Sequence, residues 1–389
     1  MNNILDESQI QLQIHIWDDL EICPSILRGI YAYGYEKPSP IQQKAILPMI
    51  AGKNLIAQAQ SGTGKTAAFT IGSLTKVDLS SNSTQVLIMC PTRELASQIT
   101  SVVSNISQMM DGLRVKTIVG GTSISDDVED MRARPPHVIV GCPGRIYDMI
   151  QRKHIATSTL KMVVLDEADE MLSEGFSQQT QGIFRELNEE TQIALFSATL
   201  PQNIKQITQN FMNSEPVYIS VKSDSLTLEG IKQYFIALEN DEQKFNTLKD
   251  LYEHISVSQC IIYCNSVQRV IDLYTALHAD NFPVCYIHSK MGGAEREYAF
   301  KEFRTGAARV LISSNVTARG IDIQQVSVVI NFDLSRDIHT YLHRIGRSGR
   351  WGRKGTGINF VTKRDVYTLR EIERYYATQI EELPANFSV

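Results

Sequence analysis

The chain has no long hydrophobic run. None of its apolar segments approaches the roughly 18 residues that a helix needs to cross a bilayer. Its opening, Met1-Asn2-Asn3, lacks the basic and apolar regions of a signal peptide. We therefore predict a protein without a membrane partner that resides in the cytoplasm, with the nucleus as the alternative.

Cysteine is scarce and irregularly spaced. The chain contains six cysteines without paired zinc-ligand spacing: Cys23, Cys90, Cys142, Cys260, Cys264 and Cys285. This pattern argues against a disulfide framework and against a zinc site. We interpret the six side chains as reduced thiols that lie mostly in the core.

Positive charge is not in excess either. The 38 Lys and Arg residues against 43 Asp and Glu leave a net charge of −5, so a nucleic-acid partner would need a local groove. With 43% hydrophobic and 21% charged residues, the composition is that of an ordinary globular protein. A length of 389 residues suits two domains of roughly 150 to 200 residues each.

A glycine-rich loop stands between a short apolar stretch and a helical pattern. It reads Ala59-Gln60-Ser61-Gly62-Thr63-Gly64-Lys65-Thr66. Glycines at this spacing let backbone N–H groups surround phosphate oxygens at a helix N-terminus. The lysine would reach the β- and γ-phosphates, and the Thr66 hydroxyl would ligate Mg²⁺. Taken alone, the loop leaves open a glycine-rich turn with an accidental lysine, since Ala59 stands where the general pattern has glycine.

An acidic motif supports the first interpretation. Asp166-Glu167-Ala168-Asp169 follows the apolar run 162–165. Carboxylates at the end of a buried strand are how nucleotide hydrolases hold Mg²⁺, partly through water, and place an attacking water. Together the two motifs predict a nucleoside-triphosphatase.

Short apolar strands alternate with longer helical patterns in both halves of the chain. The expected strands are 86–89, 115–119, 138–140, 162–165 and 193–196, then 260–263, 284–287, 310–312, 328–330 and 358–361. This rhythm predicts an α/β fold with two parallel sheets, each covered by helices on both faces. The polar stretch between the two series predicts a linker.

The expected organisation has four parts. Residues 1–16 form a mobile N-terminal segment, 17–221 the first domain, 222–230 a short linker and 231–389 the second domain.

The second half carries the basic run His343-Arg344-Ile345-Gly346-Arg347-Ser348-Gly349-Arg350. Its arginines could stabilise the charge that builds on a transferring phosphoryl group, as arginine fingers do. A basic surface patch is the other interpretation, and on this run alone it is favoured.

The order of these motifs resembles the DEAD-box family of RNA-dependent ATPases, in particular the translation initiation factor 4A subgroup and its exon-junction paralogue. The resemblance spans about residues 17–386. It implies two tandem RecA-like domains with ATP and Mg²⁺ as cofactors. It also implies an adenine-recognition motif at 28–42, in which Gln42 reads the base and Tyr35 stacks on it, with Trp17 as an upstream aromatic.

The resemblance assigns further site residues by motif. The nucleotide contacts are Tyr35, Gln42, Ser61, Gly62, Thr63, Gly64, Lys65, Thr66, Gly320 and Asp322. The catalytic residues are Lys65, Asp166, Glu167, His343, Arg347 and Arg350, with Thr66 and Asp166 at the metal. The RNA contacts are Thr92, Arg93, Gly121, Cys142, Arg145, Ser314 and Arg319, and Ser197 and Thr199 couple the RNA and nucleotide sites.

Departures from the family pattern lie on the RNA side. Cys142 replaces threonine, Ser314-Asn315 replaces threonine and aspartate, and Val267 replaces a common arginine. Gly292-Gly293 stands where relatives carry proline and glutamine. A thiol is a weak donor, so one phosphate contact is expected to weaken.

The expected function is an RNA-stimulated ATPase that binds single-stranded RNA without strong sequence preference and separates short duplexes locally. The alternatives are an ATP-gated RNA clamp of the exon-junction type and a scaffold that has lost RNA coupling. By resemblance, the protein is expected to act as a monomer and to bind a middle-domain scaffold of the initiation factor 4G type.

Overall fold

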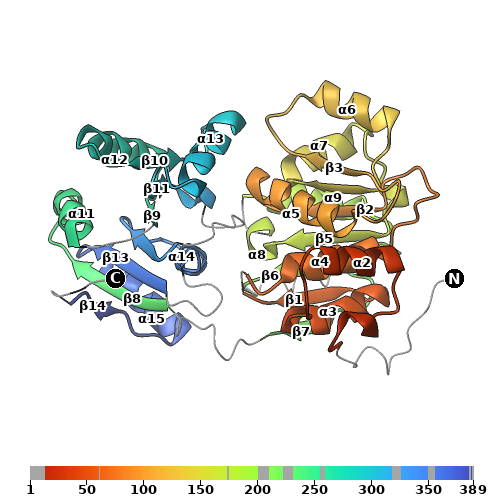
Figure 1. The fold of residues 1–389 in the computed structure, drawn as a ribbon, viewed down its shortest axis with the longest axis horizontal. Coiled ribbons are helices and arrows are strands. Elements are labelled where there is room, and N and C mark those ends of the chain that lie inside the picture. The colour runs from red at the N-terminus through yellow and green to blue at the C-terminus, as the bar shows by residue number, and fades with distance from the viewer. Residues whose placement is uncertain are drawn as a thin grey trace. The chain divides into compact units, whose positions relative to one another are not determined.

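The structure, a computed structural model, describes residues 14–60, 62–172, 175–199, 210–221, 231–254, 259–317, 326–348, 355–384 and 387. The chain divides into two compact units, Met1–Ser223 and Asp224–Val389 (Figure 1). Of the segment 1–16, only the last three residues are described, and Ile14 among them is buried. In the described part of the chain, no helix combines the length and apolar character needed to cross a membrane.

The first unit contains a seven-stranded parallel sheet with the order β3-β4-β2-β5-β6-β1-β7. Its strands are β1 (Leu55–Gln58), β2 (Val86–Met89), β3 (Val115–Ile118), β4 (Val138–Gly141), β5 (Met162–Asp166), β6 (Gln192–Ser197) and β7 (Val217–Ser220). The central strands β2, β4, β5 and β6 read as apolar runs because helices cover both faces of the sheet, so their successive side chains are all buried.

Helices of the first unit pack on the two faces through separate cores. The helices are α2 (Pro24–Ala32), α3 (Pro40–Ile50), α4 (Lys65–Leu74), α5 (Arg93–Ile106), α6 (Ile124–Ala133), α7 (Pro143–Gln151), α8 (Ala168–Met171) and α9 (Ser177–Arg185). Short 3-10 turns are η1 (Trp17–Asp19) and η2 (Thr157–Thr159). Alternate residues of one strand divide between the cores: Ile88 packs with Phe69 and Ile99, whereas Leu87 packs with Met149.

The second unit repeats this topology. Its parallel sheet has the order β10-β11-β9-β12-β13-β8-β14, which is the order of the first sheet with every strand number raised by seven. The strands are β8 (Ile231–Ala237), β9 (Cys260–Tyr263), β10 (Val284–Ile287), β11 (Val310–Ser313), β12 (Val328–Asn331), β13 (Gly355–Val361) and β14 (Glu381–Glu382). The helical elements are α11 (Gln243–His254), α12 (Val267–Ala279), α13 (Gly293–Arg304), η4 (Asn315–Thr317), α14 (Ile338–Ile345) and α15 (Val366–Tyr376).

The two helix-flanked parallel sheets confirm the predicted fold class, and each of the ten predicted strands is present with ends that differ by at most three residues. The ten predicted strands do not include β1, which is the short apolar stretch noted before the glycine-rich loop, and the prediction omitted β7, β8 and β14. Tyr218 of β7 is 52% exposed, and β8 mixes polar with apolar residues, so neither gives the continuous apolar signal of a central strand. The predicted linker 222–230 lies outside the described residues.

The cysteines are free, as predicted. Cys90, Cys260, Cys264 and Cys285 are buried, Cys142 is half-buried and Cys23 is exposed.

Candidate active site and RNA-contact residues

The glycine-rich loop joins β1 to α4. Its first N–H, on Ala59, donates to the carbonyl of Ser197 over 3.0 Å, which fixes the loop to the end of β6. Gly62 and Gly64 have φ values of 83° and 100°, a left-handed conformation that side chains other than glycine disfavour. Gly64 is the residue before the first turn of α4, and Lys65 opens that helix. The loop therefore directs a helix N-terminus at the space where phosphate would bind.

Gln42 is hydrogen-bonded to this glycine-rich loop. Its Nε2 donates to the Gly64 carbonyl over 3.2 Å, and its Oε1 accepts the N–H of Ser39 over 2.7 Å. A Cβ at Gly64 would lie 2.6 Å from Gln42 Nε2 and 2.8 Å from Ser39 Oγ. Glycine is thus needed at position 64 for space as well as for φ. The contribution of Ser39 was missed, although a serine before Pro40 is a typical helix N-cap.

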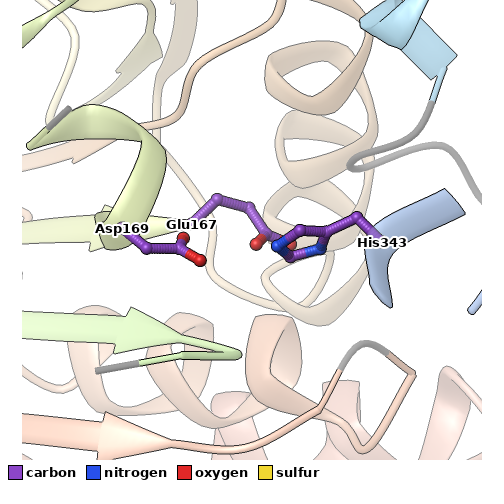
Figure 2. Close-up of side chains that lie close together, drawn as sticks. All are labelled: Glu167, Asp169 and His343. Carbon is purple, nitrogen blue, oxygen red and sulfur yellow. The ribbon is translucent and has the colours of Figure 1, made fainter. Parts of the chain in front are cut away.

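Three carboxylates, those of Asp166, Glu167 and Asp169, lie at and just after the end of β5. The Glu167 N–H donates to Asp166 Oδ1 over 3.0 Å, and Glu167 has a left-handed φ of 53°. This turn places Glu167 and Asp169 at the start of α8 (Figure 2). All three carboxylates are at most 8% exposed. A non-glycine residue in this conformation, next to buried charge, is the kind of local strain that marks functional sites.

The charge of this cluster is incompletely balanced. Lys65 is 6% exposed, and its Nζ lies 4.0 Å from Glu167 Oε1. Among the described residues, that ammonium has no hydrogen-bond partner. Burial raises the pKa of Asp166 to about 7, and the neighbouring Glu167 charge adds to the shift while Lys65 opposes it. Such a site favours an added cation near the carboxylates and an anion near the ammonium.

The predicted coupling residues contact the acidic motif directly. Thr199 Oγ1 donates to Asp169 Oδ2 over 2.7 Å. Ser197 Oγ accepts the N–H groups of Asp169 and Thr199 over 3.4 and 3.3 Å. The end of β6 is therefore hydrogen-bonded both to the phosphate loop and to the carboxylate cluster.

The predicted adenine-side aromatics form a cluster. The Tyr35 ring is half-buried and lies 4.9 Å from Tyr33 and 6.4 Å from Trp17, between ring centroids. Trp17 is fully buried, and its indole N–H donates to the Tyr35 carbonyl over 2.9 Å. Trp17 therefore positions the backbone of Tyr35 from within the core.

Two predicted RNA contacts of the first unit touch each other. Thr92 caps α5 by accepting the N–H of Leu95 over 3.2 Å. The Arg93 guanidinium lies against Gly121, where a Cβ would fall 2.3 Å from Arg93 Nη1. The φ of 86° at Gly121 favours glycine at this position, and the end of the arginine side chain occupies the space beside it.

Arg145 is engaged within its own unit. Its guanidinium donates to Asp127 Oδ2 over 3.1 Å and to the hydroxyl and carbonyl of Thr122 over 3.2 and 2.9 Å. Lys116 also approaches Asp127, at 3.4 Å. Arg145 therefore shapes the loop after β3, and any phosphate contact uses the donors that remain. Sequence reasoning missed Asp127, because nothing in the local pattern links residues so far apart in the chain.

In the second unit, His343 and Arg347 lie on or just after α14. They are 2% and 3% exposed, and Arg347 Nε donates to the His343 carbonyl over 3.3 Å. His343, also drawn in Figure 2, comes from α14. Ser314 follows β11 and is buried. Ser61, Arg319, Gly320, Asp322 and Arg350 lie outside the described residues.

The environment of Arg344 could not be recognised from the sequence. This arginine sits in the basic run, yet it is fully buried. Its guanidinium donates to the side-chain oxygens of Asn265, Asn315 and Asn331 and to the Asp333 carbonyl. It thereby ties together the segments after β9, β11 and β12. Burial lowers its pKa to about 10.

Comparison with known proteins shows to which family this chain is similar. A family model for the DEAD/DEAH box helicase matches residues 39–207, and a model for the helicase conserved C-terminal domain matches residues 243–352. The ATP-dependent RNA helicase eIF4A of Scheffersomyces stipitis is 53% identical over 382 residues, which cover 98% of this chain and 96% of the relative. The eIF4A of Neurospora crassa is 52% identical over 380 residues, covering 98% and 95%.

The chain belongs to the DEAD-box helicases. It is an ATP-dependent RNA helicase of the eIF4A type, and thus an enzyme that hydrolyses ATP. The predicted family and enzyme class are confirmed.

Solved structures agree with this DEAD-box assignment. The Saccharomyces cerevisiae Dbp5 structure bound to RNA and ADP BeF3 superposes with a TM-score of 0.86 at 34% identity, covering 97% of this chain and 96% of that one. Mss116p bound to ssRNA and AMP-PNP gives a TM-score of 0.84 at 25% identity, covering 96% and 81%. Both likenesses extend over the two sheets, so the tandem RecA-like fold is confirmed.

Proposed function

We propose that this DEAD-box helicase binds ATP with Mg²⁺ at the first unit, grips single-stranded RNA and separates short RNA duplexes locally. The main support for the proposal is the environment of the Lys65 ammonium. A lysine buried at a helix N-terminus, without a hydrogen-bond partner among the described residues and 4.0 Å from Glu167, is costly unless an anion completes its environment. A triphosphate supplies that anion.

The nucleotide contacts of the first unit come from two segments that a hydrogen bond links. Gln42 and Tyr35 face adenine, and the phosphates lie against residues 62–66. Because Gln42 already bonds the Gly64 carbonyl, adenine recognition and loop conformation share one side chain. The full set of proposed nucleotide residues is Tyr35, Gln42, Ser61, Gly62, Thr63, Gly64, Lys65, Thr66, Gly320 and Asp322.

The residues near the phosphates fit Mg²⁺, which prefers oxygen ligands. Thr66 offers a hydroxyl, and Asp166 offers a carboxylate whose pKa is already raised by burial and by a neighbouring negative charge. Mg²⁺ would neutralise charge on the phosphates and the carboxylates. Thr66 and Asp166 would hold it, the latter partly through water.

Hydrolysis needs a positioned water and stabilised charge. Glu167 orients the water and accepts its proton, while Lys65 holds the phosphate that receives the attack. From the second unit, His343 assists near the water, and Arg347 and Arg350 stabilise the charge that develops on the phosphoryl group. This assignment makes turnover depend on both units.

The protein binds RNA through the phosphates of the RNA backbone. The proposed residues are Thr92, Arg93, Gly121, Cys142, Arg145, Ser314 and Arg319. Hydroxyl and guanidinium donors suit phosphate oxygens, which gives affinity without sequence preference. Ser197 and Thr199 link this side to the acidic motif through the bonds to Asp169.

The cellular setting follows from the relatives. We infer action on RNA in translation initiation, in the cytoplasm, as a monomer that binds a middle-domain scaffold of the initiation factor 4G type. The identity to eIF4A proteins over 98% of the chain supports this inference.

The test is steady-state ATP hydrolysis with and without single-stranded RNA at fixed low salt, since electrostatic affinity depends on salt. RNA should stimulate turnover, and Glu167→Gln should abolish it while ATP still binds. Hydrolysis that ignores RNA would contradict the coupled mechanism and favour a protein whose RNA contacts have been lost.

A further inference from the structure

Two cysteines stand side by side where the candidate RNA contacts begin. β2 pairs in parallel with β4, with Met89 opposite Gly141, so the next residues on the two strands are Cys90 and Cys142. The pairing continues past the strands, because the Cys90 N–H donates to the Gly141 carbonyl over 3.0 Å. The two thiols therefore follow neighbouring strands at the same level.

Both thiols point to the same face of the sheet. Side chains alternate along a strand, so Cys90 shares its face with Val86 and Ile88, and Cys142 shares its face with Val138 and Val140. The four valine and isoleucine side chains and Cys90 belong to one core cluster. Paired strands lie about 4.7–4.9 Å apart, which falls inside the Cα separation of about 4.4–6.8 Å that a disulfide requires.

The two thiols differ in access. Cys90 is fully buried, and Cys142 is half-buried at the start of α7. Burial raises the pKa of Cys90 well above its ordinary range, and a hydrogen bond with Cys142 raises it further. An oxidant in solution therefore reacts first with Cys142, which is the more accessible thiol. Cys90 is the buried neighbour that can then react with the oxidised Cys142 sulfur.

We propose that Cys90 and Cys142 are a reversible oxidation site that closes to a disulfide and weakens RNA binding. With a peroxide as oxidant, the Cys142 thiol becomes a sulfenic acid and one water is released. The Cys90 sulfur then attacks the Cys142 sulfur, the S–O bond breaks, and the hydroxyl leaves with the Cys90 proton as a second water. Two thiols and one peroxide thus give one disulfide and two waters.

The disulfide acts on the segments that follow the two strands. Cys90 precedes Thr92 and Arg93 at the start of α5, and Cys142 precedes Arg145 in α7. Closing the bond removes the Cys142 S–H donor and fixes the starts of both helices. The effect on RNA rests on the proposed function, whereas formation of the disulfide does not.

The first experiment uses the wild-type full chain with hydrogen peroxide, followed by alkylation and peptide mapping. The expected product is a cross-linked pair of peptides carrying Cys90 and Cys142, with two hydrogens lost, that dithiothreitol separates. Cys23 is exposed and serves as an internal control for indiscriminate oxidation. Cross-links that join Cys142 to Cys23 in another molecule, or sulfinic acid at Cys142 without a cross-link, would overturn the proposal.

The second experiment measures RNA affinity before oxidation, after oxidation and after reduction. The oxidised wild type should bind RNA about tenfold more weakly, as expected for loss of a charge-assisted contact, and reduction should restore binding. Cys90→Ala and Cys142→Thr should each lose the reversible response, and either variant suffices if the other fails to fold. An oxidised protein that carries the disulfide but binds RNA unchanged would refute the effect on RNA. A reduced protein that does not bind RNA would instead refute the proposed function, with the disulfide still measurable.

Discussion

In both units a lysine lies in the first turn of the helix that follows the first strand, and carboxylates lie at or just after the end of the fifth strand. In the first unit these are Lys65 after β1 and Glu167 after β5. In the second unit they are Lys244 after β8 and Asp333 after β12. The strand order of the two sheets is the same, so the two lysine–carboxylate pairs occupy equivalent places.

The two lysines differ in how closely carboxylates pair with them. Lys244 Nζ lies 3.1 Å from Asp333 Oδ1 and 2.9 Å from Asp241, and Arg269 adds a second cation on Asp333 at 2.9 Å. Lys65 Nζ stays 4.0 Å from Glu167, with further carboxylates at Asp166 and Asp169. A phosphate loop precedes Lys65, whereas the segment before α11 has no glycine.

The difference separates a structural ion pair from a ligand site. A closed, neutral cluster contributes to the stability of its unit and leaves no charge to attract a ligand. An open cluster is costly in the free protein, and binding of nucleotide and Mg²⁺ offsets that cost. The same fold position thus serves stability in one unit and chemistry in the other.

The largest effect is expected from Lys65→Ala. Loss of this ammonium removes a donor aimed at the phosphates, so turnover should fall about 10²–10³-fold. Nucleotide binding by fluorescence and steady-state hydrolysis measure the change. Lys244→Ala is the matched control, and it should leave ATP affinity unchanged at temperatures below its unfolding. Equal losses of ATP affinity in the two variants would contradict the distinction between a ligand-binding Lys65 and a structural Lys244.

Asp333→Asn should produce the largest loss of stability. The amide leaves Lys244 and Arg269 without their shared carboxylate, at a cost of about 3 kcal/mol. Denaturant unfolding, with hydrogen exchange in β9 and β12 to identify the unit, measures it. Asp169→Asn is the counterpart in the first unit. The Asp169 carboxylate accepts the Glu170 N–H at Oδ1 and the Thr199 hydroxyl at Oδ2. In the amide, the oxygen still accepts the Glu170 N–H and the NH2 group donates to the Thr199 hydroxyl, so the cost should be clearly smaller. A larger cost for Asp169→Asn would contradict this assignment.

Thr199→Val tests whether the open cluster is coupled to RNA. The substitution keeps the shape of the side chain and removes the 2.7 Å bond to Asp169, between groups that are 5% and 8% exposed. Loss of one buried hydrogen bond to a charged group is worth about 1.5 kcal/mol, so RNA stimulation of hydrolysis should fall roughly tenfold. ATP affinity without RNA should stay within a factor of about two.

The control for that experiment is Thr180→Val. It removes a buried hydroxyl bond to the Met171 carbonyl, at the end of the same helix α8 but away from Asp169. If both threonine variants reduce RNA stimulation equally, the effect reflects the stability of α8 and not a link through Asp169.

The sequence predicted those parts of the molecule whose signal is local. Buried central strands give apolar runs, and the phosphate loop and the acidic motif are contiguous, so both were found. Lys65 and Asp166 were placed correctly relative to β1 and β5 for that reason.

Side-chain contacts between segments that are far apart in the chain could not be predicted from the sequence. Asp127 of α6 pairs with Arg145 of α7, and Arg344 looks like one more cation in a basic run. Its burial depends on acceptors from three separate segments, which only the folded chain brings together.

Asn315→Asp gives the smallest expected effect and sharpens the comparison within the second unit. Asp333 has cationic partners, whereas the Arg344 guanidinium donates to the neutral amide oxygens of three asparagines. Asn315 Oδ1 accepts from Arg344 Nε and Nη2 over 2.9 and 2.6 Å, so a carboxylate in the same place would form a bidentate, charge-assisted pair. Since Asn315 is exposed, its carboxylate costs little to desolvate, and stability should rise by about 1 kcal/mol.

Asn331→Asp is the control that distinguishes charge from position. Asn331 is fully buried, and its Nδ2 donates to Asn359 Oδ1 over 2.8 Å. A carboxylate there also faces Arg344, but it loses the donor and meets the Asn359 oxygen, so thermal unfolding should shift to lower temperature. If both variants stabilise the protein, the charge of Arg344 dominates the cluster. If Asn315→Asp destabilises the protein, the amide is required at position 315, and the Arg344 cluster differs from the Lys244–Asp333 cluster in not accepting a carboxylate.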